Sequence, residues 1–452
     1  MLRFDGIVLG LVIIGSGCAT HKHQDVQVKK EKKVQIAPSA KNVEKKSENV
    51  EYITQNIDKY VKNFQNQQLT LDQSRYEKHY FKVWNISKPS HTLKNVQWPF
   101  ETFHYPKGYG ANLQLLKPSF YEEMKRKANF EQYGSVNQKA LSLKELNLRS
   151  FPTDKPLFYN PKLVGEGFPF DYMQNSTLHA NKPLFVTHYS KDKEWAHVES
   201  SFTYGWVKSD DIVLLKENYT KKWQRAQQVV VVKEGIPLYG KDGEFLFYTK
   251  LGMMFALIDE TKNDYTLLAV ARTKLLQPHF VRVKVSKDVI HKGILPLTQK
   301  NLANVLKNLV GKPYGWGGLY GQRDCSSTLR DFYAPFGVWL PRNSHQQAQH
   351  GIKIDMSHLS DTEKLETIQI FAKPFQTLLY RKGHIALYAG IVDGKVTILQ
   401  NLWGIKTKEK QKEGRYVIGK TIFSTLEFGK ELTNYDKNSS MLHSLESMNT
   451  LF

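Results

Sequence analysis

Apolar residues near the start of the chain recur at a helical period. After Ser47 they are spaced three and four residues apart, at Val50, Ile53, Ile57, Tyr60, Val61 and Phe64. This spacing puts apolar side chains on one face of an amphipathic helix, and Ser47 is suited to cap its start. Two more helices are expected near 118–130 and 135–146. Residues 47–147 are therefore predicted to form a mostly helical N-terminal segment.

After this segment the pattern changes to short β-type runs interrupted by Gly, Pro and Asn. Over 148–216, Trp195 precedes a Gly205-Trp206 corner, which is typical of a small β-barrel whose alternating residues fill the interior. Both tryptophans are accordingly expected in the barrel core rather than on a ligand platform. A second series of β-type runs indicates another small barrel over 217–292.

The rest of the chain mixes helix and strand patterns. Apolar positions between 302 and 309 predict a helix that ends near Gly311. Later apolar runs at 383–390 and 396–402 predict strands. We therefore expect an α+β domain over 293–430, followed by a C-terminal tail over 431–452.

The first residues have the layout of a secretory signal. An apolar run over 6–14 is too short to span a bilayer, and small residues follow it and lead to Cys18. A cysteine in this place resembles the end of a bacterial lipobox, although Gly15 stands where Leu, Val or Ile is usual. We expect residues 1–18 to be the signal and Cys18 to be lipidated, with an uncleaved anchor or an ordinary signal peptide as the alternatives.

Basic residues are the main feature of the composition. Lysines crowd residues 19–46, which are expected to form a disordered tether, and no later stretch is long and apolar enough to cross a membrane. The formal charge of the chain is +21, which indicates an anionic partner. Export argues against nucleic acid as this partner and favours anionic envelope polymers or lipid head groups. The alternative is that the basic residues form a solvated surface without a specific partner.

Cys325 is the candidate nucleophile. The chain has two cysteines, and since the N-terminal signal accounts for Cys18, Cys325 has no obvious disulfide partner. Asp324 can cap an apolar helical run, which places the thiol beside unpaired backbone N–H groups. These groups favour a thiolate and could stabilise an oxyanion. A buried structural cysteine is the plainer alternative.

A base and an orienting group follow in the predicted strands. His384 lies at the start of the first strand, and a structural histidine is the alternative reading of it. The next strand carries Gln400 and Asn401 on opposite faces, and either amide could accept the second imidazole N–H. The other histidines of this region lack a ligand spacing, so neither a metal nor a cofactor is expected.

Three blocks in this order resemble the signature of the NlpC/p60 cysteine peptidases: YGWGG (314–318), DCSS (324–327) and GHIALYAG (383–390). Two further blocks, FGVWLPRNSHQQ (336–347) and LQNLWG (399–404), resemble the branch that carries two SH3-like barrels and an N-terminal stabilising segment. The resemblance implies an α+β chain with a papain-like NlpC/p60 catalytic domain, preceded by two small SH3-like β-barrels and a mostly helical N-terminal segment.

The resemblance also implies roles for single residues. Cys325 would be the nucleophile and His384 the base. The third position is commonly His in the family, and the matching residue here is Gln400, with Asn401 as a competitor. An amide can hold the imidazole by a hydrogen bond but cannot share its charge.

The substrate site implied by the resemblance lies around Tyr314, Asp324 and Ser326. A carboxylate beside a thiolate opposes ionisation of the thiol, so Asp324 is better explained as a helix cap or as a partner for a substrate amine. Core packing is the alternative explanation for Tyr314.

The activity implied by the resemblance is hydrolysis of peptidoglycan stem peptides, usually between γ-D-glutamate and a diamino acid. Peptidoglycan peptides would be the partner, and a lipid anchor would hold the protein on a membrane, facing the periplasm or the wall. Two alternatives are a wall-binding scaffold with weak or no catalysis, which the unusual third residue favours, and acyl transfer to an amine on the same fold.

Overall fold

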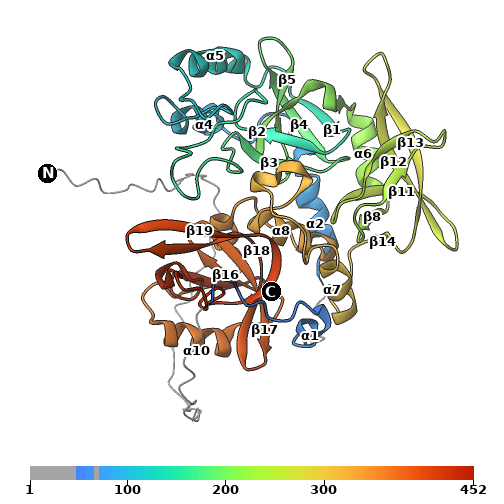
Figure 1. Ribbon diagram of the computed structural model, residues 1–452. Coiled ribbons are helices and arrows are strands. Elements are labelled where there is room, and N and C mark those ends of the chain that lie inside the picture. Colours follow the sequence, from blue (N-terminus) through green and yellow to red (C-terminus); the bar gives the residue numbers. More distant parts are fainter. Residues whose placement is uncertain (1–46, 66–70) are drawn as a thin grey trace. The chain divides into compact units, whose positions relative to one another are not determined.

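The computed structural model describes residues 47–65 and 71–452, and the predicted signal, the tether and Cys18 lie outside them. In Figure 1 the described chain forms a helical N-terminal segment, two small barrels and a domain of helices around one sheet. This order confirms the α+β fold class expected from the sequence. In the described part of the chain, no helix is both long and apolar enough to cross a membrane.

The N-terminal segment consists of short helices. They are α1 (Ile57–Val61), α2 (Gln73–Tyr80), η1 (Lys82–Trp84), α3 (Leu93–Val96), α4 (Trp98–Thr102), α5 (Pro118–Ala128) and η2 (Phe130–Gln132). The first helix is shorter than its apolar period predicts, because Asn56 caps it while Ser47 forms a β-bridge with Leu432. Tyr60 of α1 stacks on Phe423 with ring centroids 3.7 Å apart, so α1 packs on the C-terminal domain.

The helix predicted near 135–146 is wrong. This stretch forms two strands, β1 (Gln138–Ser142) and β2 (Leu146–Arg149), which belong to the sheet of the first barrel. Leu146 and Leu148 are buried while Asn147 between them is exposed, which is the two-residue period of a strand. The first barrel therefore begins before residue 148.

The first barrel is a seven-stranded sheet in the order β3-β2-β6-β5-β4-β1-β7. Its other elements are β3 (Gln174–Leu178), β4 (Pro183–Tyr189), β5 (Trp195–Glu199), β6 (Tyr204–Lys208), η3 (Ser209–Asp211) and β7 (Ile212–Leu214). Gly205 has a φ of 155°, and a Cβ on it would lie 2.7 Å from the carbonyl oxygen of Arg149. Glycine is thus required where β6 passes close to β2.

The two tryptophans of this barrel are buried against a neighbour that the sequence did not indicate. Trp195 and Trp206 are each 1% exposed, and they pack with Ala128, Phe100 and Phe130 of the N-terminal segment. Smaller aliphatic residues of the barrel strands form a separate core cluster. The indoles therefore join the barrel to the N-terminal helices rather than filling its interior.

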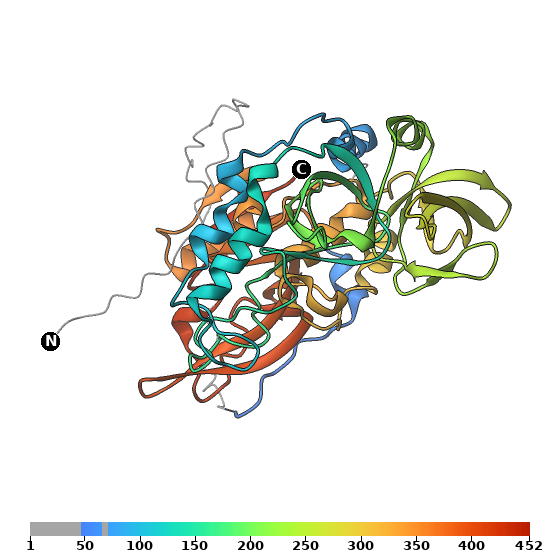
Figure 2. The ribbon, with the colours of Figure 1, turned by 90° about the horizontal axis from the view of Figure 1, so that it is seen from above.

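The second barrel follows the connecting helix α6 (Glu217–Arg225). It consists of β8 (Gln228–Val231), β9 (Pro237–Tyr239), β10 (Phe245–Tyr248), β11 (Met254–Glu260), β12 (Asp264–Arg272), β13 (Pro278–Ser286) and β14 (Ile290–Lys292). Five of its strands pair in the order β13-β12-β11-β8-β14, and β9 and β10 form a hairpin. In Figures 1 and 2 the first barrel lies between helices α4 and α5 on one side and the second barrel on the other.

The C-terminal domain is a six-stranded antiparallel sheet with helices on both faces. Its elements are α7 (Gln299–Leu306), η4 (Trp316–Gly321), α8 (Cys325–Tyr333), η5 (Ala334–Phe336), α9 (Ser344–Gln347), β15 (Ile352–Asp355), α10 (Asp361–Phe371), β16 (Thr377–Arg381), β17 (His384–Val392), β18 (Lys395–Glu409), β19 (Lys412–Thr425), η6 (Lys437–Ser439) and β20 (Ser447–Thr450). Residues of α7 and α8 share a core with one face of β17 and β18, whereas Ile368 of α10 packs on the other face.

The stretch over 431–452, predicted to be a tail, contributes a strand to this sheet. The strand order is β15-β20-β16-β17-β18-β19, so β20 pairs on both sides. Met448 of β20 is buried in the core cluster under α10. The apolar pattern does not indicate this strand, because Ser447–Thr450 contains one large apolar residue.

Candidate active site

Helix α8 begins at Cys325, and Asp324 caps it as the sequence predicts. The Asp324 carboxylate accepts a hydrogen bond from the Ser327 backbone N–H at 2.8 Å, and the Ser327 hydroxyl accepts one from the Asp324 backbone N–H at 2.9 Å. This reciprocal capping box fixes the start of the helix. The Cys325 side chain retains partial exposure and stands in the first turn, where backbone N–H groups have no intrahelical acceptor.

Strand β17 brings the imidazole of His384 to the same place. The backbone N–H of Ile385, the next residue along the strand, interacts with the Cys325 thiol. His384 Nε2 lies 2.8 Å from Gln400 Oε1 on the neighbouring strand β18. The imidazole is therefore bound at Nε2, which leaves Nδ1 without a bond to this amide.

The orientation of the Gln400 amide follows from its other partner. Its Nε2 donates to the Ser424 hydroxyl at 2.7 Å, and that hydroxyl donates to the Thr425 carbonyl oxygen at 3.0 Å. Because the amide nitrogen is used in this way, the amide oxygen faces His384 and accepts a hydrogen bond from the Nε2–H group. The tautomer of His384 is then the one in which Nδ1 can accept a proton.

Asn401 points elsewhere. Its Nδ2 donates to the Arg323 carbonyl oxygen at 2.7 Å and to Thr328 Oγ1 at 3.0 Å, so its amide is turned toward α8 and the segment before it. Of the two amides that the sequence offered for the third position, only that of Gln400 contacts His384.

The thiol and the imidazole are both held in their neutral forms. Burial raises the pKa of Cys325 to about 12, and the negative charge of Asp324 adds to this effect. Burial lowers the pKa of His384 to about 3, and the positive charge of Arg381 acts in the same direction. Before substrate binds, the Cys325 thiol and the His384 imidazole are therefore both neutral and do not form a thiolate–imidazolium ion pair.

The other residues expected around the substrate lie close to the thiol. Burial, together with the charges of Cys325 and Asp324, raises the pKa of Tyr314, which places its phenol within electrostatic reach of both. The Tyr314 ring lies 5.8 Å from that of Trp403. Ser326 is buried, and its hydroxyl donates to Asp324 at 3.1 Å.

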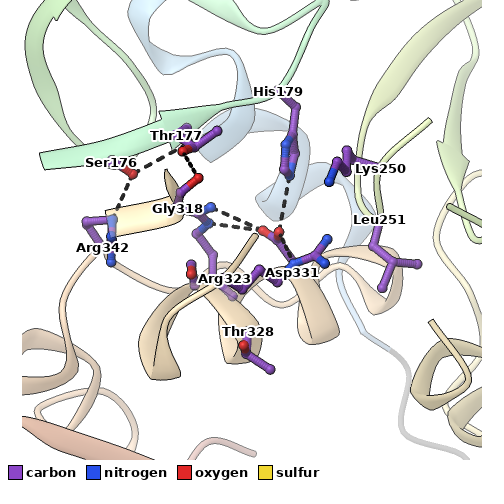
Figure 3. A network of polar contacts seen from close by, with 12 residues as sticks. Ser176, Thr177, His179, Lys250, Leu251, Gly318, Arg323, Thr328, Asp331 and Arg342 are labelled. Carbon is purple, nitrogen blue, oxygen red and sulfur yellow. Dashed lines mark hydrogen bonds and ion pairs between the residues drawn. The ribbon is translucent and has the colours of Figure 1, made fainter. Parts of the chain in front are cut away.

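Arg342 also lies at this site, although the sequence does not predict a role for it. Its Nη2 pairs with Asp324 Oδ2 at 2.7 Å, its Nη1 donates to the Ser326 hydroxyl at 2.9 Å, and its Nε donates to Ser176 Oγ at 2.7 Å. Ser176 belongs to β3 of the first barrel, as Figure 3 shows. The feature of the sequence that could have pointed to this residue is that it is the one arginine within block 336–347.

The first barrel also contacts the segment that precedes the nucleophile. Thr177 Oγ1 donates to the Gly318 carbonyl oxygen at 2.8 Å, and a Cβ on Gly318 would collide with the Thr177 side chain. Trp316 Nε1 donates to the Asp171 carbonyl oxygen at 3.1 Å. The glycines of block 314–318 thus allow β3 to approach this segment.

A buried ionic network joins both barrels to α8 (Figure 3). Asp331 of α8 accepts from Arg323 Nε at 2.7 Å and lies 3.2 Å from Nε2 of His179, which follows β3. Arg323 also pairs with Glu234 of the second barrel. Although burial raises the pKa of the Asp331 carboxyl, the charges of His179 and its arginine neighbours hold it well below the usual range.

Within residues 47–65 and 71–452, no three His, Cys, Asp or Glu side chains form a group that could hold a metal ion.

Comparison with family models finds four matches in order along the chain. They are the NLPC_P60 N-terminal stabilising domain over 7–133, an SH3 domain of the SH3b1 type over 156–208, an SH3 domain of the SH3b2 type over 217–262 and the NlpC/P60 family over 311–447. These are the parts that the sequence blocks had indicated.

One of the solved structures that resemble this chain supports the fold. An NlpC/P60 endopeptidase from Photobacterium damselae subsp. piscicida superposes with a TM-score of 0.78 at 23% identity, covering 88% of this chain and 97% of that one. An NlpC/P60 family protein from Bacillus cereus ATCC 10987 has a TM-score of 0.43 at 17% identity, covering 61% of this chain and 82% of that one.

Among curated proteins, a γ-D-glutamyl-L-lysine dipeptidyl-peptidase from Bacillus cereus is 37% identical over 60 residues. This match covers 13% of the present chain and 18% of the relative, so the chain matches less than a fifth of that protein's length. The family models, by contrast, cover the N-terminal segment, both barrels and the C-terminal domain, and the chain therefore belongs to the NlpC/P60 family.

Proposed function

We propose that this protein is a cysteine peptidase that hydrolyses peptidoglycan stem peptides at the bond between γ-D-glutamate and a diamino acid. The observations that carry the proposal are the His384 imidazole, which Gln400 holds at 2.8 Å, and the Cys325 thiol at the start of α8, with which the backbone N–H of Ile385, the next residue of β17, interacts. Family membership supports hydrolysis of wall peptides, and the name of the partial Bacillus relative supports the γ-D-glutamyl bond.

The reaction begins with proton transfer from Cys325 Sγ to Nδ1 of His384. The thiolate attacks the carbonyl carbon of the γ-amide, and the oxyanion accepts hydrogen bonds from backbone N–H groups at the start of α8. The imidazolium then gives its proton to the leaving amine as the C–N bond breaks. Water, deprotonated by the same imidazole, attacks the thioester and releases the acid product and the thiol.

The neutral resting state fits a transfer that accompanies attack. With the thiol pKa about 12 and the imidazole pKa about 3, a separated thiolate and imidazolium are unfavourable before substrate arrives. The oxyanion contacts and the leaving amine become available only with substrate bound. The charged pair is then stabilised during the reaction rather than before it.

We further propose that Tyr314, Asp324 and Ser326 receive the N-terminal amine of the stem peptide. Asp324 Oδ1 already accepts from the side chains of Ser326 and Ser327, whereas Oδ2 accepts from Arg342 alone. An ammonium could therefore bind at Oδ2. Since Arg342 offsets the charge of this carboxylate, the gain is smaller than an unpaired carboxylate would give.

The test is incubation of the purified full-length protein with L-Ala-γ-D-Glu-L-Lys, followed by mass measurement of the products. Hydrolysis releases the dipeptide and lysine; transfer attaches the acyl group to an added amine; a binding scaffold leaves the peptide intact. We expect hydrolysis, and slower hydrolysis of the N-acetylated peptide.

Cys325→Ala is expected to abolish cleavage while leaving the melting temperature nearly unchanged, because the side chain is small and partly exposed. Ser439→Ala, in η6, is a matched control that should cleave normally. Cleavage by the Cys325→Ala protein would show that another group is the nucleophile.

A further inference from the structure

Arg381 is a partly buried, positively charged residue that has no role in the proposed mechanism. Its Nε is buried and has no hydrogen-bond partner among the described residues, and no carboxylate there forms an ion pair with it. Burial lowers the pKa of its guanidinium, as expected for a cation that lacks a counter-ion. A buried donor without a partner is costly, so such a group calls for an explanation.

The position of Arg381 is set by the hairpin that carries the base. It ends β16, and the register of β16 and β17 pairs it directly with His384. Directly paired residues of antiparallel strands project from the same face of a sheet. Arg381 therefore stands on the side of the sheet from which His384 projects, and its charge acts on both His384 and Cys325.

A second cation lies within reach of the first. Arg415 of β19 acts electrostatically on Arg381, and a Cβ on Gly165, in the loop before β3, would lie 2.9 Å from Nη2 of Arg415. Glu413 and Asp436 act on Arg415 and offset part of its charge, whereas Arg381 forms no ion pair with a carboxylate of the described residues, so an anion bound beside Arg381 would relieve the repulsion between the two arginines. Arg381 retains partial exposure, so an incoming anion can reach it.

The chemistry of the substrate supplies an anion at the right place. A γ-linked glutamate uses its side-chain carboxyl in the scissile amide and leaves its α-carboxylate free, a few bonds from the carbon that is attacked. Guanidinium is the side chain best suited to bind a carboxylate through paired N–H donors. An α-carboxamide at this position has the same shape but no charge.

We propose that Arg381, supported by Arg415, binds the α-carboxylate of the γ-linked glutamate and selects it over the α-carboxamide. This inference rests on the proposed function, since it names the substrate group that the site recognises. The arginine is a binding residue, and it takes no part in proton transfer.

The test compares L-Ala-γ-D-Glu-L-Lys with the peptide that carries D-isoglutamine at the second position. The wild-type protein should cleave the carboxylate peptide about 10- to 100-fold more efficiently, in kcat/KM, than the amide peptide. Arg381→Gln should lose most of this preference by slowing only the carboxylate peptide, and Arg381→Lys should retain part of it. Arg282→Gln, on the exposed face of β13, is the matched control and should keep the full preference.

Equal loss on both peptides in Arg381→Gln would overturn the proposal, because it would mean that the arginine acts on the thiol or the imidazole. Absence of preference in the wild-type protein would overturn it as well. Binding of the same two peptides to Cys325→Ala protein, measured by calorimetry, separates this failure from that of the proposed function. If the Cys325→Ala protein binds the carboxylate peptide more tightly and the wild-type protein cleaves neither peptide, the proposed hydrolytic function fails and the inference stands. If the Cys325→Ala protein binds both peptides equally, or binds neither, the inference fails.

Discussion

The imidazole of His384 is oriented by a neutral amide, and the amide is itself oriented. In the chain of hydrogen bonds from His384 through Gln400 to Ser424, each group has a fixed direction of donation. An acidic third residue would stabilise the imidazolium by its charge, which an amide cannot do. The role left to Gln400 is to select the tautomer and hold the ring in place.

Gln400→Ala is therefore expected to lower kcat by about a hundredfold or more, because His384 becomes free to rotate and to exchange its tautomer. Gln400→His should retain substantial activity. Asn401→Ala removes the bonds to Arg323 and Thr328, so it should lower the stability by about 1–3 kcal/mol and affect kcat much less. Kinetics and thermal melting on the same preparations distinguish these outcomes, and the reverse ranking in kcat would transfer the orienting role to Asn401.

A separate residue-scale prediction concerns Cys18, which lies outside the described residues. We propose that it carries a lipid anchor. Cys18→Ser should release the protein from the membrane fraction, since basic charge alone binds lipid surfaces weakly and reversibly. Substitution of Lys29 by Gln, in the same segment, should leave the fractionation unchanged. Retention of the Cys18→Ser protein on membranes after a salt wash would contradict lipid anchoring.

At the scale of elements, local signals were reliable where one residue decides the structure. The cap at Asp324 and the strand that starts at His384 are where the sequence predicts them, because capping and strand alternation are short-range effects. The same chemistry that begins α8 puts the thiol in its first turn. The sequence thus predicts where the proposed nucleophile and base lie in the fold, and their catalytic roles stay predictions.

The errors arose where pairing over long distances decides the structure. Val136, Ala140 and Leu143 fit a helical spacing, but the pairing of this stretch with the other strands of the first barrel selects the strand. Strand β20 forms because β15 and β16 pair with it, although Ser447–Thr450 is mostly polar. The spacing of apolar residues within one segment does not show which strands will pair with it.

The substrate side of the site was the hardest to foresee for the same reason. Arg342, Arg381 and Arg415 come from three separate parts of the C-terminal domain; Arg342 stands within block 336–347 with no role assigned to it, and neither Arg381 nor Arg415 stands in such a block. Only the fold reveals that Arg342 neutralises Asp324 while Arg381 has no counter-ion. The role of a charged residue depends on which groups lie next to it in the fold, and the sequence alone does not show these neighbours.

At the scale of the molecule, both barrels are tied to the helix that carries the nucleophile. Ion pairs link Glu145 and His179 of the first barrel and Glu234 of the second to Asp331 and Arg323. Figure 3 shows the contacts of His179 and Arg323 with Asp331. Removing one partner of a buried ion pair leaves an uncompensated charge and costs more than the pair contributes. The stability of the described body should therefore depend on the protonation of this network.

The sign of that dependence follows from the two shifted groups. Burial lowers the pKa of His179, but the charges of Asp331 and Glu145 outweigh it and raise the pKa above its usual value. Its stabilising contribution is then fully present below about pH 6.5 and is lost as the pH rises through the folded-state value. The depressed pKa of Asp331 gives the opposite limit, since its contribution is lost when the pH falls below about 4.

His179→Gln should consequently lower the melting temperature by several degrees between about pH 4.5 and 6, and by progressively less as the pH rises through the raised folded-state pKa and wild-type His179 loses its proton. Thermal melting of both proteins across this range measures the difference. His443→Gln is the matched control: its ring lies 3.2 Å from Asp361, but its side chain is 47% exposed, so solvent screens the pair and little change is expected at any pH. A deficit of equal size at pH 5 and pH 9 would mean that His179 contributes by packing alone, and that its charge does not hold the first barrel to α8.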